Sequence, residues 1–215
     1  MSPVFAHRTE AGQRLAQRLL GLRLPHPVVL ALPRGGVPVA AEVARALGAP
    51  LDLLLVRKIG APLQPEWAIG ALTEGEPEVL DIEERTLQAC GATRDDVLRT
   101  LPAHRQEIAR RRALYLGGRA PLPLQGCTAL LVDDGIATGA TVRAAIRAVR
   151  QRQPQRVVLA VPVAPASELP ALRALVDELV CLSAPECFGA VGRHYADFST
   201  IEDADVVALM RRFGV

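Results

Sequence analysis

Residues 128–141, with the sequence TALLVDDGIATGAT, constrain this chain more than any other segment. A short apolar run ends in two adjacent carboxylates, Asp133 and Asp134, and a loop of small residues follows them. Short apolar runs bounded by turn residues are typical of the buried strands of parallel sheets. The pattern therefore predicts a strand, a small-residue loop and a helix that begins near Val142.

The loop has the composition of an anion-binding site. Because its side chains are small, several backbone N–H groups can converge on an anion at the N-terminus of the next helix. Thr138 and Thr141 add hydroxyl donors, and the two carboxylates accept hydrogen bonds from vicinal hydroxyl groups. A ligand with a phosphate at one end and a sugar diol at the other, such as a ribose 5-phosphate, fits this pattern. An Asp that merely caps a helix would explain only one of the two carboxylates.

The segment VDDGIATGAT at residues 132–141 resembles the signature of type I phosphoribosyltransferases, which bind phosphoribosyl pyrophosphate (PRPP). The resemblance implies that Asp133 and Asp134 hold the 2- and 3-hydroxyl groups of the ribose. It also implies an α/β fold with a doubly wound, mainly parallel sheet and an inserted hairpin and helical lid. The residues that it assigns to the 5-phosphate are Gly135, Ile136, Ala137, Thr138, Gly139, Ala140 and Thr141.

Composition agrees with a single globular domain over residues 1–215. Half of the residues are apolar and 22% are charged, and 215 residues suit one α/β domain better than two. A net charge of +2 gives no general surface for nucleic acid. The four cysteines form no Cys-x-x-Cys pair, so free thiols are expected.

No apolar stretch approaches about 20 residues, the length that spans a bilayer. The first residues, MSPVFAHR, lack the apolar core of a signal peptide. We therefore expect neither a membrane nor a nucleic-acid partner, and a cytoplasmic location.

Strand and helix patterns alternate along most of the chain. The expected strands cover residues 28–32, 51–56, 128–132, 157–161 and 179–182. The expected helices cover residues 9–22, with Thr9 as N-cap, and residues 37–47, 142–152, 167–176 and 203–212. This alternation predicts parallel strands with right-handed crossovers, and a ligand beyond the carboxyl ends of the strands.

Residues 59–118 interrupt the alternation. A hairpin is expected within residues 67–80, followed by helices at 82–90 and 95–115. The second helix is rich in arginine, and its charged face is either solvated or close to a diphosphate. By resemblance, the insertion takes the place of a mobile catalytic loop that excludes water from a reactive ribosyl cation. The sequence leaves open whether it acts as a lid or as a contact in the expected homodimer.

The loop after the first expected strand joins a cation to two glycines. Gly35 and Gly36 let the main chain approach a ligand closely, and the guanidinium of Arg34 suits phosphate oxygens. A plain Gly-rich turn before a helix is the alternative. The resemblance implies that Arg34 and Gly35 bind pyrophosphate, that Arg34 contributes to catalysis, and that a cis peptide bond joins the two residues.

Arg57 and Lys58 follow the second expected strand. Two consecutive cations cannot both be buried in a sheet, so at least one should face the cleft or solvent. Lys58 is the only lysine of the chain. The resemblance implies that both residues bind pyrophosphate and that Lys58 is the second catalytic candidate. A solvated strand end is the alternative.

The C-terminal tail, residues 183–215, is expected to form a hood over the acceptor. The pattern Phe-x-x-Val-Gly with a later Asp is faintly similar to the hypoxanthine-guanine type of the family. It implies that Phe188 and Val191 contact the base or second substrate, with Tyr195 and Asp197 behind them. The alternative is that these aromatic residues pack the last helix onto the sheet.

The chemistry that the resemblance implies is displacement of pyrophosphate from ribose C1 by a nitrogenous base or a related small nucleophile. It depends on Mg²⁺, held mainly by the ligand, with Asp133 and Asp134 as the candidate protein contacts. Catalysis would rest on positioning and charge neutralisation. Ala137 stands where the hypoxanthine-guanine type has an Asp that handles a base proton, which argues against a 6-oxopurine.

A regulator that binds PRPP or a nucleotide without turnover is the alternative from another class. The presence of Arg34, Arg57 and Lys58, and the lack of an appended helix-turn-helix pattern, favour the enzyme. The reverse or a hydrolytic reaction on a nucleotide would use the same site.

Overall fold

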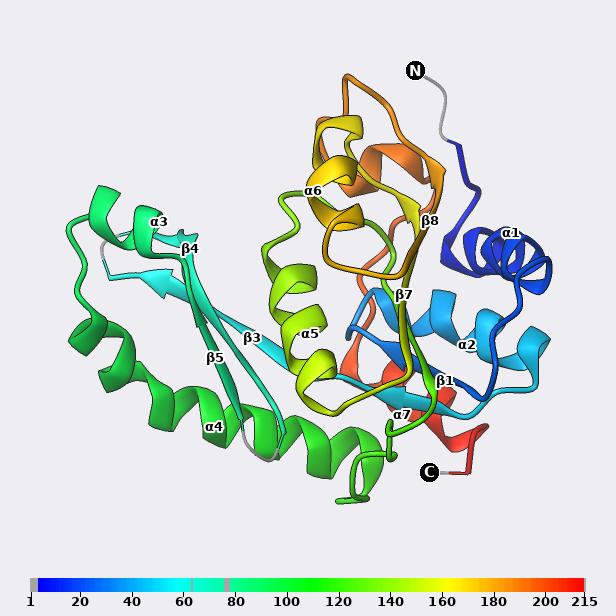
Figure 1. The fold of residues 1–215 in the computed structure, drawn as a ribbon, viewed down its shortest axis with the longest axis horizontal. Helices are drawn as coiled ribbons and strands as arrows, with labels where there is room; N and C mark the ends of the chain where they lie inside the picture. The colour runs from blue at the N-terminus through cyan, green and yellow to red at the C-terminus, as the bar shows by residue number, and fades with distance from the viewer. Residues whose placement is uncertain (1–3, 63, 76–77, 215) are drawn as a thin grey trace.

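A parallel sheet forms the centre of the protein (Figure 1). The computed structural model describes residues 4–62, 64–75 and 78–214. The sheet has the order β2-β1-β6-β7-β8, and all neighbouring strands are parallel. Its strands are β1 (Pro27–Ala31), β2 (Leu51–Leu53), β6 (Thr128–Val132), β7 (Arg156–Val163) and β8 (Glu178–Ser183).

Helices cover both faces of this sheet. In β6, Leu130 and Val132 pack with α1 (Arg8–Leu20) and α2 (Gly36–Leu47), whereas Leu131 packs with α5 (Ala140–Gln151) and α6 (Leu169–Arg173). The period of two along a strand sends alternate side chains to opposite faces. The predicted α/β class and the doubly wound sheet are therefore confirmed. The last helix, α7 (Asp203–Arg211), packs against α2.

The order of the strands places a topological switch point between β1 and β6. The chain leaves β1 toward β2 at one edge and later returns to β6 on the other side of β1. Ala31 and Val132 lie side by side in the register, and the N–H of Leu32 donates to the carbonyl of Val132 at 3.0 Å. Ligands of open α/β sheets bind at such a point, beyond the carboxyl ends of the strands. The predicted site loops, residues 32–36 and 133–141, both begin there.

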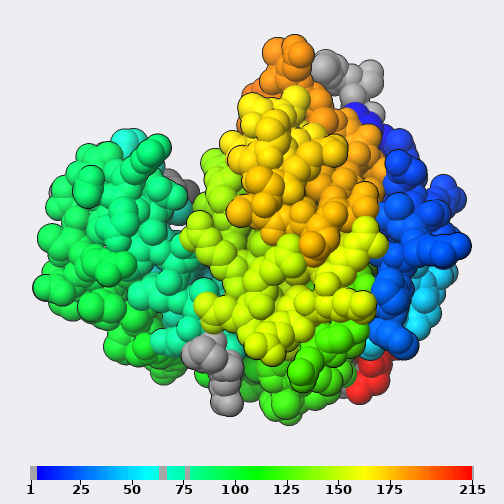
Figure 2. Space-filling model, viewed as in Figure 1, coloured from blue at the N-terminus to red at the C-terminus, as the bar shows by residue number. Residues whose placement is uncertain are grey.

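Residues 56–116 form an arm that extends from the central sheet (Figure 1). An antiparallel sheet of order β3-β4-β5 is followed by two helices. Figure 2 shows a hollow between this arm and the rest of the molecule. The predicted hairpin and both predicted helices are present. The elements are β3 (Val56–Ala61), β4 (Gln64–Thr73), β5 (Val79–Ile82), α3 (Glu84–Ala89) and α4 (Arg94–Leu116).

The expected single strand at residues 51–56 is wrong, because the apolar run is divided between two sheets. β2 ends at Leu53, and the N–H of Leu54 still bonds to Ala31 of β1 at 3.0 Å. The carbonyl of Leu55 instead accepts from the N–H of Glu74, next to β4, at 3.0 Å. Hydrophobic periodicity reports burial but not which strand is the partner. Arg57 and Lys58, which were expected to follow this strand, lie instead within β3, the first strand of the arm.

Two helix boundaries also differ from those expected. The first helix begins at Arg8, because the ring Nδ1 of His7, not Thr9, accepts the capping hydrogen bond from the N–H of Glu10. The helix expected at residues 167–176 is a 3₁₀ turn, Ala166–Glu168, followed by the short α6. Within the described residues, no helix has both the length and the apolar content needed to cross a bilayer.

Candidate functional site

The acidic pair follows β6 directly and lies in a largely buried position. The carboxylate of Asp133 accepts from the N–H of Asp134 at 2.9 Å. Burial raises the pKa of both carboxyl groups, and the neighbouring Asp134 raises the pKa of Asp133 further. The cations Lys58 and Arg8 act in the opposite direction on Asp133. The pair thus presents carboxylates whose charge depends on the cations around them.

Arg8 is the residue of this site that the sequence reasoning missed. Its Nε donates to Asp134 Oδ2 at 2.7 Å, and its Nη1 donates to the carbonyl of Ser199 at 2.8 Å. The guanidinium also lies 3.7 Å from the centre of the Phe198 ring, and Arg8 is only 8% exposed. The hydrogen bond from Arg8 lowers the pKa of Asp134 against the effect of burial. The sequence contains one indication of this role, because Arg8 stands at the start of a helix. A cation is disfavoured in the first turn of a helix unless another group binds it.

The small-residue loop surrounds a cavity at the N-terminus of α5. The cavity has a volume of about 150 Å³. Gly139, the N-cap of α5, has φ +72°, a conformation that glycine adopts at little cost, and no side chain caps the helix. The first N–H groups of α5 are therefore available to an anion. The cavity is lined by Lys58, Asp133, Val142, Val191 and all seven predicted phosphate-loop residues, Gly135 to Thr141.

The loop after β1 touches the acidic pair. A Cβ atom at Gly35 would lie 2.1 Å from Asp134 Oδ2, and one at Gly36 would lie 2.9 Å from the Cα of Asp133. Glycine is required at both positions because the two loops approach so closely. Arg34 is 3.5 Å from carboxylate oxygens of both Glu202 and Asp203. The predicted pyrophosphate loop and the acidic pair are thus neighbours through Gly35 and Gly36, whereas the guanidinium of Arg34 lies against the C-terminal tail.

The expected cis peptide bond between Arg34 and Gly35 is wrong. The cis bond of this loop joins Pro33 to Arg34, one residue earlier.

Arg57 and Lys58 point to opposite faces of β3. Lys58 lines the cavity of the phosphate loop. The pKa of Arg57 is lowered, first by burial and then by Arg111 and Arg110 of α4. Because alternate residues of a strand face opposite sides, β3 delivers only one of the two cations to the cleft. The structure brings Lys58 to the loop and leaves Arg57 against α4.

The predicted base-contact residues of the tail do not all reach the loop. Val191 does, because a Cβ at Gly135 would lie 2.5 Å from its Cγ1. Phe188 stacks on His194, with ring centroids 5.0 Å apart. Tyr195 is 4% exposed and its hydroxyl donates to the carbonyl of Asp134 at 2.5 Å. Asp197 is exposed and accepts from the N–H of Ser199 at 2.9 Å.

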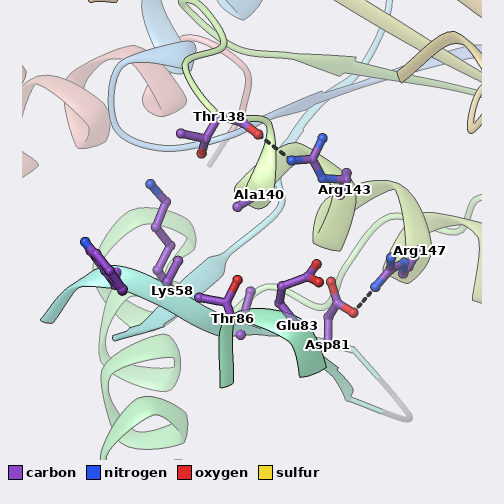
Figure 3. Close-up of a pocket in the computed structure, with 12 residues that line it drawn as sticks. Lys58, Asp81, Glu83, Thr86, Thr138, Ala140, Arg143 and Arg147 are labelled. Carbon is purple, nitrogen blue, oxygen red and sulfur yellow. Dashed lines mark hydrogen bonds and ion pairs between the residues drawn. The ribbon is translucent and has the colours of Figure 1, made fainter. Parts of the chain in front are cut away.

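A second cavity adjoins the first, between the arm and α5 (Figure 3). It has a volume of about 480 Å³ and shares Lys58, Thr138 and Ala140 with the phosphate-loop cavity. Its arm side includes Trp67, Glu83 and residues of β4 and β5. The two cavities therefore lie side by side along the N-terminal part of α5.

The donors at the acidic pair fit Mg²⁺ only if the ligand supplies most of the coordination. Among the described residues, no group of three His, Cys, Asp or Glu side chains is arranged to hold a metal ion. Mg²⁺ keeps several waters and is usually bound by one or two carboxylates together with substrate phosphates. Asp133 and Asp134 supply that number of carboxylates.

Comparison with known proteins agrees with this geometry. The family model of the phosphoribosyl transferase domain matches residues 7–197. The chain is 46% identical over 210 residues to the Mycobacterium tuberculosis protein named "Putative phosphoribosyl transferase Rv0571c", a match that covers 97% of this chain and 47% of that protein. The counterpart in strain CDC 1551 matches equally well. This chain therefore spans about half the length of the curated relatives that it matches.

A solved structure is similar over the whole chain. The crystal structure of TT1426 from Thermus thermophilus has a TM-score of 0.83 and 44% sequence identity, and the match covers 99% of both chains. The arm is therefore included in the similarity. With the family model spanning both site loops, the chain belongs to the phosphoribosyl transferase domain family.

Proposed function

We propose that this protein is a Mg²⁺-dependent phosphoribosyltransferase. It transfers the phosphoribosyl group of PRPP to a nitrogenous base or a related small nucleophile and releases pyrophosphate. The observation that carries the proposal is the meeting of two loops at the switch point. The uncapped N-terminus of α5 and the acidic pair lie after β6, and Gly35 touches Asp134 from the loop after β1.

Each part of PRPP has a matching group of the protein in this arrangement. The first N–H groups of α5, with the hydroxyls of Thr138 and Thr141, bind the 5-phosphate. Asp133 and Asp134 accept hydrogen bonds from the two ribose hydroxyls. Arg8 lowers the pKa of Asp134 against the effect of burial, which favours the ionised form that accepts hydrogen bonds.

The leaving pyrophosphate gains negative charge as its bond to C1 breaks. Lys58, which lines the loop cavity, and Arg34 at the end of β1 are the cations that neutralise this charge. Arg34 must exchange its contacts with Glu202 and Asp203 for the diphosphate. Mg²⁺, when bound, supplies further neutralisation of the diphosphate. We assign Arg57 no such contact, since its side chain faces α4.

The tail contributes less to the acceptor than the resemblance implies. Val191 is the tail residue with access to the loop cavity, whereas the Tyr195 hydroxyl serves to hold the backbone of Asp134. The homodimer expected from the resemblance remains part of the proposal, and sedimentation equilibrium tests it.

The experiment is a turnover assay with PRPP, Mg²⁺ and a panel of purines, pyrimidines and amines, which follows pyrophosphate release. The proposal expects release with at least one acceptor. PRPP binding without release for any acceptor would instead support a regulator that binds PRPP. Absence of PRPP binding would contradict both functions.

A further inference from the structure

Another cavity lies at the junction of the arm with the core, where α4 runs back from the arm (Figure 1). Its volume is about 620 Å³, within the range of small-molecule sites. Its walls come from β4, α4, residues 121–125, which connect α4 to β6, and Arg152, the C-cap of α5. Among the described residues, it shares none of its lining with the phosphate-loop cavity or with the cavity between the arm and α5. A ligand in this cavity would therefore contact both the arm and the core, apart from the proposed phosphoribosyl site.

The wall of this junction cavity is apolar over the arm and the connecting segment. Leu72 of β4 and Ile108 of α4 line it, and Pro121, Leu122 and Leu124 line it from the connecting segment. Hydrocarbon side chains offer a ligand no hydrogen bond, and they favour a ligand surface that is itself apolar. The wall therefore suits a ligand with an apolar body.

Arg152 is the cation of the cavity without a carboxylate partner in the described part of the chain. The other two arginines of the lining have such partners, in the pairs Arg105 with Glu78 and Arg112 with Glu74. The Nη2 of Arg152 donates to the carbonyl of Leu122, a neutral acceptor. Burial lowers the pKa of Arg152, because its guanidinium has lost part of its hydration. An anion in the cavity would replace that hydration.

The buried polar groups around the cavity are also short of acceptors. Asp52, which is fully buried, lies 3.6 Å from Arg119 and 3.9 Å from Arg112. With Asp52 and Arg119 included, four guanidinium groups meet three carboxylates among the described residues. Three buried side-chain atoms of this region have no hydrogen-bond partner within the described residues: Thr73 Oγ1, Arg112 Nη2 and Arg119 Nε. Folded proteins pair almost all such atoms, so this junction has room for one more acceptor with a negative charge.

We propose that the junction cavity is a binding site for a small carboxylate with an apolar body. The carboxylate accepts hydrogen bonds from Arg152, and the body lies against Leu72, Ile108 and Leu124. Because the ligand contacts both parts of the fold, its binding fastens the arm to the core. The proposed phosphoribosyl site shares no residue with this one, so the inference does not rest on the proposed function.

Calorimetric titration of the wild-type protein with three probes tests the two parts of the ligand. The first probe, 3-phenylpropanoate, has both the apolar body and the charge. The second, 3-phenylpropanamide, has the same body without the charge, and acetate has the charge without the body. We expect 3-phenylpropanoate to bind one site per chain, and each of the other two to bind at least about tenfold more weakly.

Two arginine variants locate the site. Arg152→Gln should weaken the binding of 3-phenylpropanoate about tenfold or more and leave that of 3-phenylpropanamide within about twofold of the wild type. The matched control is Arg150→Gln on the same helix. Arg150 pairs with Asp177 at 2.9 Å and is not part of the lining. It should bind 3-phenylpropanoate as the wild type does.

Four outcomes would overturn the inference. Equal affinity for 3-phenylpropanoate and 3-phenylpropanamide would remove the charge from the account, and equal affinity for 3-phenylpropanoate and acetate would remove the apolar body. Unchanged binding of 3-phenylpropanoate by a folded Arg152→Gln would mean that the probe binds elsewhere. No binding of 3-phenylpropanoate at millimolar concentration would mean that water alone satisfies the donors of the junction. The comparison of the three probes on the wild type decides the matter even if Arg152→Gln does not fold, and a failure of PRPP to bind would not affect it.

Discussion

The contact of Arg8 with Asp134 joins the N-terminal helix to the site at the level of single atoms. Arg8 donates to Asp134, donates to the backbone of the tail at Ser199 and lies over Phe198. With side-chain exposures of 10% and 13%, the ion pair is largely shielded from water. A pair in such a position affects the charge of its carboxylate more than a surface pair does.

Arg8→Gln should shift the pH dependence of PRPP binding. The hydrogen bond and charge of Arg8 lower the pKa of Asp134, so removing them raises that pKa above its already raised value. More of the Asp134 carboxyl is then protonated at a given pH, and binding should recover only at higher pH than in the wild type. Calorimetric titrations from about pH 6 to 9 measure the midpoint. Arg14→Gln, which removes an exposed pair with Glu10 on the same helix, is the control. An unchanged midpoint in Arg8→Gln would show that Arg8 is only structural.

Asp133→Asn should stabilise the protein at neutral pH while it impairs ligand binding. The pKa of Asp133 is raised in the folded state, mainly by burial and then by Asp134, so the folded protein holds the proton more tightly than the unfolded chain. Stability therefore falls as pH rises from the unfolded pKa through the raised folded pKa. A neutral Asn escapes this loss and can still accept the N–H of Asp134.

The Asp133→Asn variant should therefore be more stable than the wild type near pH 7.5. This gain in stability should disappear below about pH 4, where Asp133 is protonated in both states. Urea denaturation at both pH values measures it. A variant that is less stable than the wild type at neutral pH would contradict the account.

The sequence predicts some of these residues better than others. The phosphate loop and the acidic pair form one continuous segment, so local chemistry identifies them. Arg8 lies 126 positions from Asp134, and only the fold brings the two together. Contacts between distant segments leave little trace in a single sequence.

At the scale of elements, strand β3 directs two consecutive cations, Arg57 and Lys58, to opposite faces. Lys58 faces the phosphate loop and Arg57 faces α4. Lys58→Ala should weaken PRPP binding about 10- to 100-fold, the effect of losing a charged hydrogen bond. Arg57→Ala should change it less than about threefold. Calorimetry of both variants beside the wild type measures this contrast. Equal losses in the two variants would mean that the arm turns Arg57 toward the ligand.

The core elements follow from the sequence, but the junction with the arm does not. The run from β6 to α5 and the other core strands have the apolar runs and turn residues of a doubly wound sheet. The apolar run at residues 51–56 gives no sign that Leu54 bonds to the core and Leu55 to the arm. The missing information is the identity of the partner strand, which hydrophobic periodicity does not contain.

At the scale of the whole molecule, buried charges fasten the arm to the core. Arg112 of α4 contacts Glu74 at 2.7 Å, with side-chain exposures of 14% and 8%. Glu74 in turn accepts from the N–H of Leu55 at 3.1 Å, where the chain leaves the core. Arg112 also lies 3.9 Å from the carboxylate of Asp52, a fully buried residue of β2 in the core. The position of the arm beside α5, and with it the second cavity, depends on these contacts.

Arg112→Met should lower the free energy of unfolding by about 3 kcal/mol, because it leaves Glu74 buried without its cation. Burial already raises the pKa of Glu74, and Arg112 opposes this effect. The loss in the free energy of unfolding should therefore be largest at neutral pH. It should shrink as pH falls toward the pKa of Glu74. Urea denaturation measures it. The control is Arg105→Met on the same helix, whose exposed pair with Glu78 should contribute less than about 1 kcal/mol. A deficit no larger than that of the control would contradict the role of Arg112.

The central claim is that the loops after β1 and β6 together bind PRPP, and calorimetric titration with PRPP and Mg²⁺ tests it most directly. The comparison is between the wild type and the double variant Asp133→Asn with Asp134→Asn. The account predicts binding by the wild type and a loss of about 100-fold or more in a double variant that remains folded, because two charged hydrogen bonds are removed. Equal affinity in the two proteins, or no binding by the wild type, would contradict it.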